Sequence, residues 1–273
     1  MVKKIFGKSY IFFTLFMMYL PILILVVFSF QDSSTIKFGG EMNEFTFELY
    51  ERLFDFENRQ SKEIWEAVGN TLLVALSAAG VSTIVGTLGA IGIFYSSRKV
   101  RNTLNSVANI SIVNAEIVTA LSLRILYSFL NVQLSYWTLL IGHVVLTIPF
   151  VVLNVMPKLQ QMDKNEYEAA LDLGATPAQA LWKVILPSIL PGIISGFLLS
   201  ITLSLDDYII TAYTADTTFD TLSTYVYKSM VKKSVPLQFR SLTTIIFFGI
   251  LIGVLIYGLV KKHKDGKNRV HKH

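Results

Sequence analysis

Six long apolar runs constrain the fold of this chain more than any other feature of its sequence. A helix needs roughly 20 mostly apolar residues to cross the hydrocarbon core of a bilayer. The charged fraction of 16% also favours lipid surroundings, because a soluble domain is typically about 25% charged. The sequence therefore predicts an all-α integral membrane protein with six transmembrane helices. The runs lie near 10–30, 67–94, 105–130, 137–157, 188–211 and 241–260.

The distribution of basic residues predicts the orientation of these helices. Lys and Arg gather in the cytoplasmic segments of membrane proteins, and six spans place both termini on the same side. We therefore expect the N and C termini in the cytoplasm. The net charge is +5, and the basic residues lie beside the apolar runs and in the tail. This placement favours anionic lipid over nucleic acid as the partner of the chain. The segments on the basic side are 1–9, 95–104, 158–187 and 261–273.

Several functions are disfavoured by residues that the sequence lacks. Without cysteine, the chain can form neither a disulfide nor a thiolate metal site. Gly7, Lys8 and Ser9 resemble the end of a phosphate-binding loop, but Val2 stands where that loop needs another glycine. The first apolar run is too long for a secretory signal, so we expect a retained helix. We therefore expect a transport subunit that is not an enzyme and binds no cofactor itself.

A polar segment, Glu166–Pro187, interrupts the apolar sequence on the side assigned to the cytoplasm. Its first part, up to Leu173, contains good helix formers and begins with an acid, which favours a short helix. Gly174 can adopt the left-handed conformation that ends such a helix. The segment is thus more than a flexible link between two spans.

A second short helix is predicted directly after this glycine. Thr176 is a favourable N-cap and Pro177 a favourable first residue, with the helix continuing over 178–184. Pro187 is expected to turn the chain into the next span. The result is a rigid elbow, and we favour a docking role over that of a simple connector. The small side chains that would let another surface come close are Ala169 and Ala170.

The elbow resembles the signature of the permease subunits of ATP-binding-cassette (ABC) importers. In that signature Glu-Ala-Ala is followed after three residues by Gly, and nine residues later by Ile-x-Leu-Pro. Val184 stands here in place of the isoleucine. The similarity extends over about residues 66–260 and includes Gly69–Ala75 and Ile148–Val152. The matching elbow residues are Glu168, Ala169, Ala170, Gly174, Leu186 and Pro187.

This resemblance implies a type I ABC importer permease in the bacterial cytoplasmic (inner) membrane. It implies an N-terminal helix and outer loop at 1–65, a permease core at 66–260 and a basic tail at 261–273. The elbow at 163–187, including Pro177, is then the coupling helix that sits in a groove of the ATPase. The implied partners are a homologous permease subunit, two ATP-binding subunits that hold ATP and Mg, and an extracytoplasmic polyamine-binding protein.

Two further segments resemble one branch of this family. Ala115–Leu123 and Ser204–Thr211 are similar to the second permease subunit of spermidine/putrescine importers, although Ala115 replaces the usual proline. The resemblance implies passage of polyamines. The alternatives are a permease for another small solute and a stand-alone secondary carrier. An intramembrane aspartic hydrolase is disfavoured because adjacent residues on a helix, such as Asp206 and Asp207, point about 100° apart.

Polar residues within the apolar runs are the candidates for a substrate pathway. Glu116 falls roughly 17 Å along the third predicted helix, where a carboxylate is costly and usually functional. It is either a counter-charge for a cation or a protonated or hydrogen-bonded residue that fixes helix packing. His143 in the fourth run is expected to form hydrogen bonds between helices, because no second metal ligand has suitable spacing.

The fifth run carries a polar stripe at helical spacing. The stripe should face a cavity or a partner helix rather than lipid. For a polycation, the carboxylate of Asp207 would attract ammonium groups, and Tyr208 would add a cation–π contact. The alternative is that Asp206 and Asp207 cap the helix end; we favour the pathway for Asp207 and leave Asp206 open. The stripe consists of Ser200, Ser204, Asp207 and Thr211.

Pairs of small residues four positions apart complete the pattern. Such pairs let helix backbones approach closely in lipid, where small residues are common at helix contacts. Packing within the chain is sufficient to explain them, and the alternative is an interface with another subunit. The pairs are Gly86/Ala90, Gly192/Gly196 and Gly249/Gly253.

Overall fold

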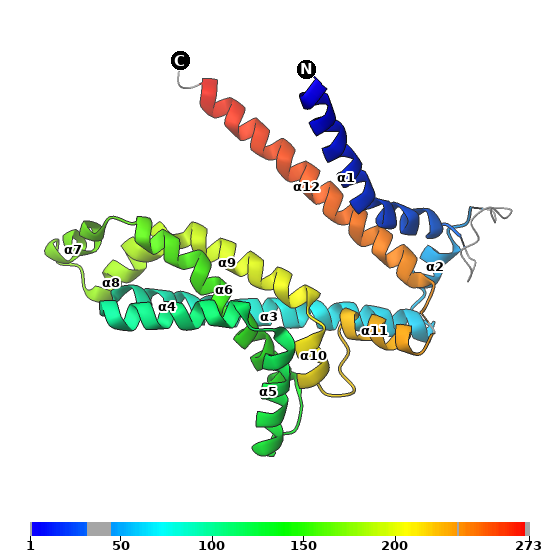
Figure 1. The fold of residues 1–273 in the computed structure, drawn as a ribbon, viewed down its shortest axis with the longest axis horizontal. Coiled ribbons are helices and arrows are strands. Elements are labelled where there is room, and N and C mark those ends of the chain that lie inside the picture. Colours follow the sequence, from blue (N-terminus) through cyan, green and yellow to red (C-terminus); the bar gives the residue numbers. More distant parts are fainter. Residues whose placement is uncertain (1, 32–44, 234, 271–273) are drawn as a thin grey trace. The chain divides into compact units, whose positions relative to one another are not determined.

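The computed structural model describes residues 2–31, 45–233 and 235–270, and all regular structure in these ranges is helical (Figure 1). The chain forms two compact units. One comprises Met1–Glu63 with Ser229–His273, and the other Ile64–Lys228. The predicted permease core at 66–260 therefore includes parts of both units.

The first unit is built from helices α1 (Val2–Phe28), α2 (Glu48–Phe54) and α12 (Gln238–Val270). Both α1 and α2 pack against α12. Leu49 and Leu53 lie four residues apart on α2 and are fully buried, which gives this short helix one apolar face. The hydroxyl of Ser241 donates to the carbonyl of Leu49 at 3.1 Å and links α12 to α2.

The second unit is centred on the long contact between α6 and α9 (Figure 1). Ala90, Val151, Val155 and Ile189 are completely buried in its core. Its helices are α3 (Arg59–Tyr95), which begins in the first unit, α4 (Arg98–Val113), α5 (Glu116–Phe129), α6 (Tyr136–Gln161), α7 (Lys164–Asp172), α8 (Pro177–Ala180), a π-helical turn (Leu181–Ile185), α9 (Leu186–Asp206), α10 (Ile209–Thr214) and α11 (Leu222–Val231).

Glycines allow the core helices to come close together. A Cβ atom on Gly192 would lie 2.8 Å from the backbone oxygen of Asn154, and one on Gly86 would lie 2.7 Å from Cβ of Val151. These contacts confirm the predicted packing role of the pairs that contain Gly86 and Gly192. Packing within the chain does not explain the pair Gly249/Gly253, since no described neighbour lies within 4 Å of their Cβ positions.

Five helical stretches among the described residues are long and apolar enough to cross a membrane. They correspond to five of the six predicted spans. The third predicted span, 105–130, is instead divided between α4 and α5, which have 16 and 14 residues. The five stretches are Tyr10–Phe28, Arg59–Tyr95, Tyr136–Gln161, Pro177–Asp206 and Gln238–Ile256.

The third span divides at two residues. Asn114 and Ala115 adopt extended conformations, with ψ angles of 132° and 129°, and α5 leaves in a different direction from α4 (Figure 1). The side-chain amide of Asn114 donates to the hydroxyl of Thr119 at 2.9 Å. The interruption is only two residues long, and apolar periodicity does not register it.

Pro187 does not turn the chain, contrary to the sequence prediction. Helix α8 continues through the π-helical turn into α9, so the second elbow helix has no separate end near 184. Within the turn, the amide of Leu186 donates to the carbonyl of Leu181, five residues earlier. A proline has no N–H and its ring crowds the carbonyl four residues before it. The wider turn gives the helix room to pass through Pro187.

Candidate functional site

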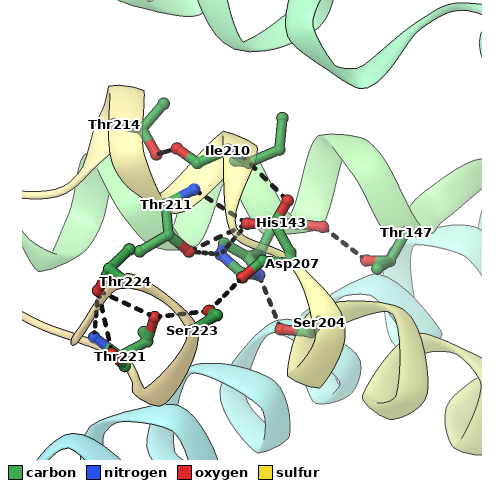
Figure 2. A network of polar contacts seen from close by, with 10 residues as sticks. All are labelled: His143, Thr147, Ser204, Asp207, Ile210, Thr211, Thr214, Thr221, Ser223 and Thr224. Carbon is green, nitrogen blue, oxygen red and sulfur yellow. Dashed lines mark hydrogen bonds and ion pairs between the residues drawn. The ribbon is translucent and has the colours of Figure 1, made fainter. Parts of the chain in front are cut away.

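His143 is the centre of a buried polar cluster in the second unit (Figure 2). Its Nδ1 atom lies 2.7 Å from Oγ of Ser204 at the end of α9, and its Nε2 atom lies 3.0 Å from Oγ1 of Thr211 in α10. One imidazole ring on α6 therefore connects three helices. The prediction that His143 forms interhelical hydrogen bonds is confirmed.

Asp207 lies in the break between α9 and α10, and its side chain is only 1% exposed. Oδ1 accepts a hydrogen bond from the amide of Ile210 at 3.1 Å. Oδ2 accepts from the amide and the hydroxyl of Thr211 at 2.9 and 3.0 Å. Asp207 therefore caps α10 and occupies N–H groups that the helix itself leaves free. Oδ2 also lies 3.5 Å from Nε2 of His143.

The predicted polar stripe is buried throughout, but a single helix does not carry it. Helix α9 ends at Asp206, so Ser200 and Ser204 precede the break while Asp207 and Thr211 follow it. The prediction of one continuous helix to residue 211 is therefore wrong. The four side chains still share an environment, because the chain folds back on α6 after the break. Among the described residues, the buried hydroxyl of Ser200 has no hydrogen-bond partner.

The first residues of α11 are tied to the same corner. The hydroxyl of Ser223 donates to the backbone carbonyl of Asp207 at 2.7 Å (Figure 2). The hydroxyl of Thr71 on α3 accepts from the amide of Leu222 at 2.8 Å. Sequence reasoning missed Thr71 and Ser223, because their partners lie far away along the chain and no local pattern marks them.

Three acids from two different predicted spans come together near this corner. Helix α5 packs against α10. Glu116 in the first turn of α5 experiences electrostatic repulsion from Asp207 and Asp206. Glu116 and Asp206 are exposed in the isolated chain, whereas Asp207 is buried. Tyr208 is half-buried, and its ring lies 4.4 Å from that of Tyr227 between centroids. The corner thus combines two exposed acids with a buried, hydrogen-bonded Asp207.

The elbow folds largely as its capping residues predict. Oδ1 of Asp163 accepts from the amide of Asn165 at 3.0 Å and begins α7. Gly174 has a φ of +85°, in the left-handed region that other residues rarely adopt. Thr176 and Gln179 then form a reciprocal capping box, with hydrogen bonds of 3.0 and 3.3 Å, and Pro177 is the first residue of α8.

One side of the elbow is anchored and the other is open. Ser188 on α9 donates to Oε2 of Glu166 at 3.4 Å. Glu168 and Ala169 are exposed, and Ala170 is half-buried. Large apolar side chains also point outward, since Leu173 is 89% and Trp182 70% exposed. Sequence reasoning missed these two residues. A large apolar side chain within a polar segment is the feature that could have identified each of them.

Comparisons with known proteins agree with these features. The family model for the binding-protein-dependent transport system inner membrane component matches residues 82–265. The spermidine/putrescine transport system permease protein PotC of Escherichia coli is 31% identical over 251 residues, covering 92% of each chain. PotC of Haemophilus influenzae is 31% identical over 248 residues, covering 91% of this chain and 93% of the relative. The E. coli putrescine transport system permease protein PotI is 29% identical, covering 92% and 89%.

Solved structures support the same fold. A chain of a bacterial ABC transporter involved in the import of the acidic polysaccharide alginate aligns with a TM-score of 0.70 and 17% identity, covering 96% of both chains. A chain of the methionine ABC transporter MetNI, in an inward-facing conformation, aligns with a TM-score of 0.53 and 17% identity. It covers 72% of this chain and 94% of that one. At this level of identity the likeness concerns the fold alone.

Proposed function

Because this chain belongs to the family of binding-protein-dependent transport system inner membrane components, we propose that it is a permease subunit of an ATP-driven importer of polyamines. One observation carries the proposal: the similarity to PotC, named for spermidine and putrescine transport, covers 92% of both chains. The chain conducts its substrate and performs no chemistry. Its partners are a homologous permease subunit, two ATP-binding subunits and an extracytoplasmic polyamine-binding protein.

The proposed topology has six spans with both termini in the cytoplasm. Helices α4 and α5 together supply the third span, with a break at Asn114 and Ala115. The excess of Lys and Arg on the side of the termini supports this orientation for a multi-pass protein of the bacterial cytoplasmic membrane. The elbow then faces the ATP-binding subunits.

The elbow couples the ATP-binding subunits to the transmembrane helices in this proposal. Glu168, Ala169 and Ala170 lie on α7, and Gly174 sets the angle at which α8 follows. Leu186 and Pro187 belong to the helix that continues into the membrane, so a displacement of the elbow reaches α9 directly. ATP binding pushes the elbows and opens the permease pair outward, and hydrolysis resets it.

The acidic corner forms part of the substrate pathway. Polyamines are flexible polycations, and the exposed carboxylates of Glu116 and Asp206 attract their ammonium groups. The buried Asp207 adds negative charge, because buried charges are poorly screened. Tyr208 offers a ring face for a weak cation–π contact. Ser200, Ser204 and Thr211 form the polar wall behind these groups, and weak contacts of this kind let a substrate leave again.

Uptake of labelled spermidine and putrescine tests the proposal in cells that lack this chain, with and without a plasmid copy. We expect uptake to disappear with the chain and to return with the plasmid. Polyamine uptake that is unchanged by the deletion, in cells without a second polyamine importer, would contradict the substrate assignment. The acids of the corner would then be assigned to helix packing.

A further inference from the structure

The hydrogen bonds around His143 have directions that follow from the chemistry of each partner. Both oxygens of Asp207 accept from backbone amides, those of Ile210 and Thr211, so this carboxylate acts as an acceptor. The single hydrogen of the Thr211 hydroxyl points to Oδ2 of Asp207. The same hydroxyl must therefore accept from Nε2 of His143, which consequently carries a hydrogen.

The other ring nitrogen is defined by Ser204. Within the described part of the chain, the hydroxyl of Ser204 has one hydrogen-bond partner, Nδ1 of His143 at 2.7 Å. The ring is completely buried, and burial disfavours its charged form. Nδ1 therefore carries no hydrogen and accepts from Ser204. The four side chains form one chain of hydrogen bonds, here called the donor chain. Ser204 donates to His143, His143 to Thr211, and Thr211 to Asp207 (Figure 2).

We propose that His143 is a positioning residue of the transport site. Its neutral ring, with hydrogen on Nε2, holds the Thr211 hydroxyl against Asp207 and thereby fixes the corner between α9 and α10. Asp206 and Tyr208 are the neighbours of Asp207 in the chain, so the same corner directs both toward the surface where substrate arrives. The inference rests on the proposed function for its effect on transport, but the donor chain itself is a property of the structure.

Two substitutions of similar polarity separate this role from general packing. The amide nitrogen of His143→Gln reaches the position of Nε2 and can still donate to Thr211. His143→Asn is one bond shorter and reaches only the position of Nδ1. In the complete importer, we expect His143→Asn to raise the half-saturating spermidine concentration about tenfold, as for one lost buried hydrogen bond, with a smaller change in maximal rate. His143→Gln should stay within about twofold of the natural protein.

Thr147→Val is the matched control on the same helix. Thr147 is buried, and its hydroxyl donates to the backbone carbonyl of His143 and contacts Ser82, outside the donor chain. We expect little change in half-saturation for this variant. If His143→Asn and His143→Gln had the same half-saturating spermidine concentration, at equal amounts of assembled importer, the positioning role would be overturned.

Nitrogen-15 NMR of the assembled importer in lipid tests the donor chain without reference to substrate. With histidine labelled in the ring, the difference between the natural protein and His143→Gln isolates the signals of His143. We expect a protonated Nε2 that shifts in Thr211→Val, and an unprotonated Nδ1. A hydrogen on Nδ1, or no response to Thr211→Val, would overturn the inference. If the natural protein restored no polyamine uptake, the proposed substrate would fail instead, and the NMR result would still decide the donor chain.

Discussion

Tyr167 on α7 packs against Tyr95 at the end of α3, with ring centroids 5.6 Å apart. The two residues lie far apart in the sequence and belong to the elbow and to a candidate span. This contact, together with the continuous helix that joins the elbow to α9, connects the elbow to two long helices at once. A force on the elbow is therefore divided between α3 and α9, which supports its proposed coupling role.

Gly174→Asp should impair docking of the ATP-binding subunits. At a φ of +85° a side chain is strained whatever the space around it, by about 1–2 kcal/mol, so the elbow would change its angle. We expect loss of co-purification with the ATPase and of polyamine uptake. Gly92→Ala, at an open helical position, is the control. Normal docking and uptake in Gly174→Asp would show that the elbow has another role.

Trp182→Ala should weaken the same contact through lost apolar area. The ring is 70% exposed in the isolated chain, so its removal should cost the fold little, whereas aromatic residues at interface centres often contribute strongly. We expect at least about tenfold weaker binding of the ATP-binding subunit in a titration with purified components. Trp137→Ala provides the comparison, because Trp137 is similarly exposed, at 68%, but lies at the N-terminal end of α6, whereas the elbow follows the C-terminal end of that helix. Equal effects of the two changes would argue against the elbow surface.

Glu116→Gln and Asp206→Asn should each weaken polyamine uptake without loss of the assembled importer. Each removes one exposed negative charge from the acidic corner, and the loss should be greater for spermidine than for putrescine, which has fewer ammonium groups. We expect a few-fold rise in half-saturating spermidine concentration, reduced at high salt because exposed charges are screened. Glu57→Gln, an exposed acid outside the corner, should have no effect. Identical uptake by all three variants would remove the corner from the pathway.

Gly192→Ala should destabilise the contact between α6 and α9. The added methyl would lie 2.8 Å from the backbone oxygen of Asn154 and 3.3 Å from Cα of Val155, so backbone atoms would have to move. Overpacking of this kind costs about 1–3 kcal/mol. We expect a lower thermal unfolding temperature for the purified importer. Gly80→Ala adds the same methyl where no atom lies within 4 Å, and an equal loss in that variant would contradict this explanation.

Much of the fold follows from short-range features of the chain. Apolar length predicts all five of the described stretches that could cross a membrane. Capping chemistry predicts the elbow, because Asp163, Gly174 and Thr176 act on residues within one turn of themselves. The break at Asn114 escaped prediction, since only two residues leave the helical conformation within an otherwise apolar run. The passage through Pro187 also escaped it, because a π-helical turn has no distinctive composition.

The candidate site likewise has features that the sequence predicts and features that only the tertiary structure decides. Hydropathy and helical spacing were enough to single out Glu116, His143 and the polar stripe, because a polar group in an apolar run is costly and conspicuous. Their geometry depends on packing between distant segments, which places Ser204 and Thr211 on opposite nitrogens of one ring. The fold alone decides that Asp207 lies buried as a cap while Asp206 is exposed, since adjacent residues with one chemistry differ only in their neighbours.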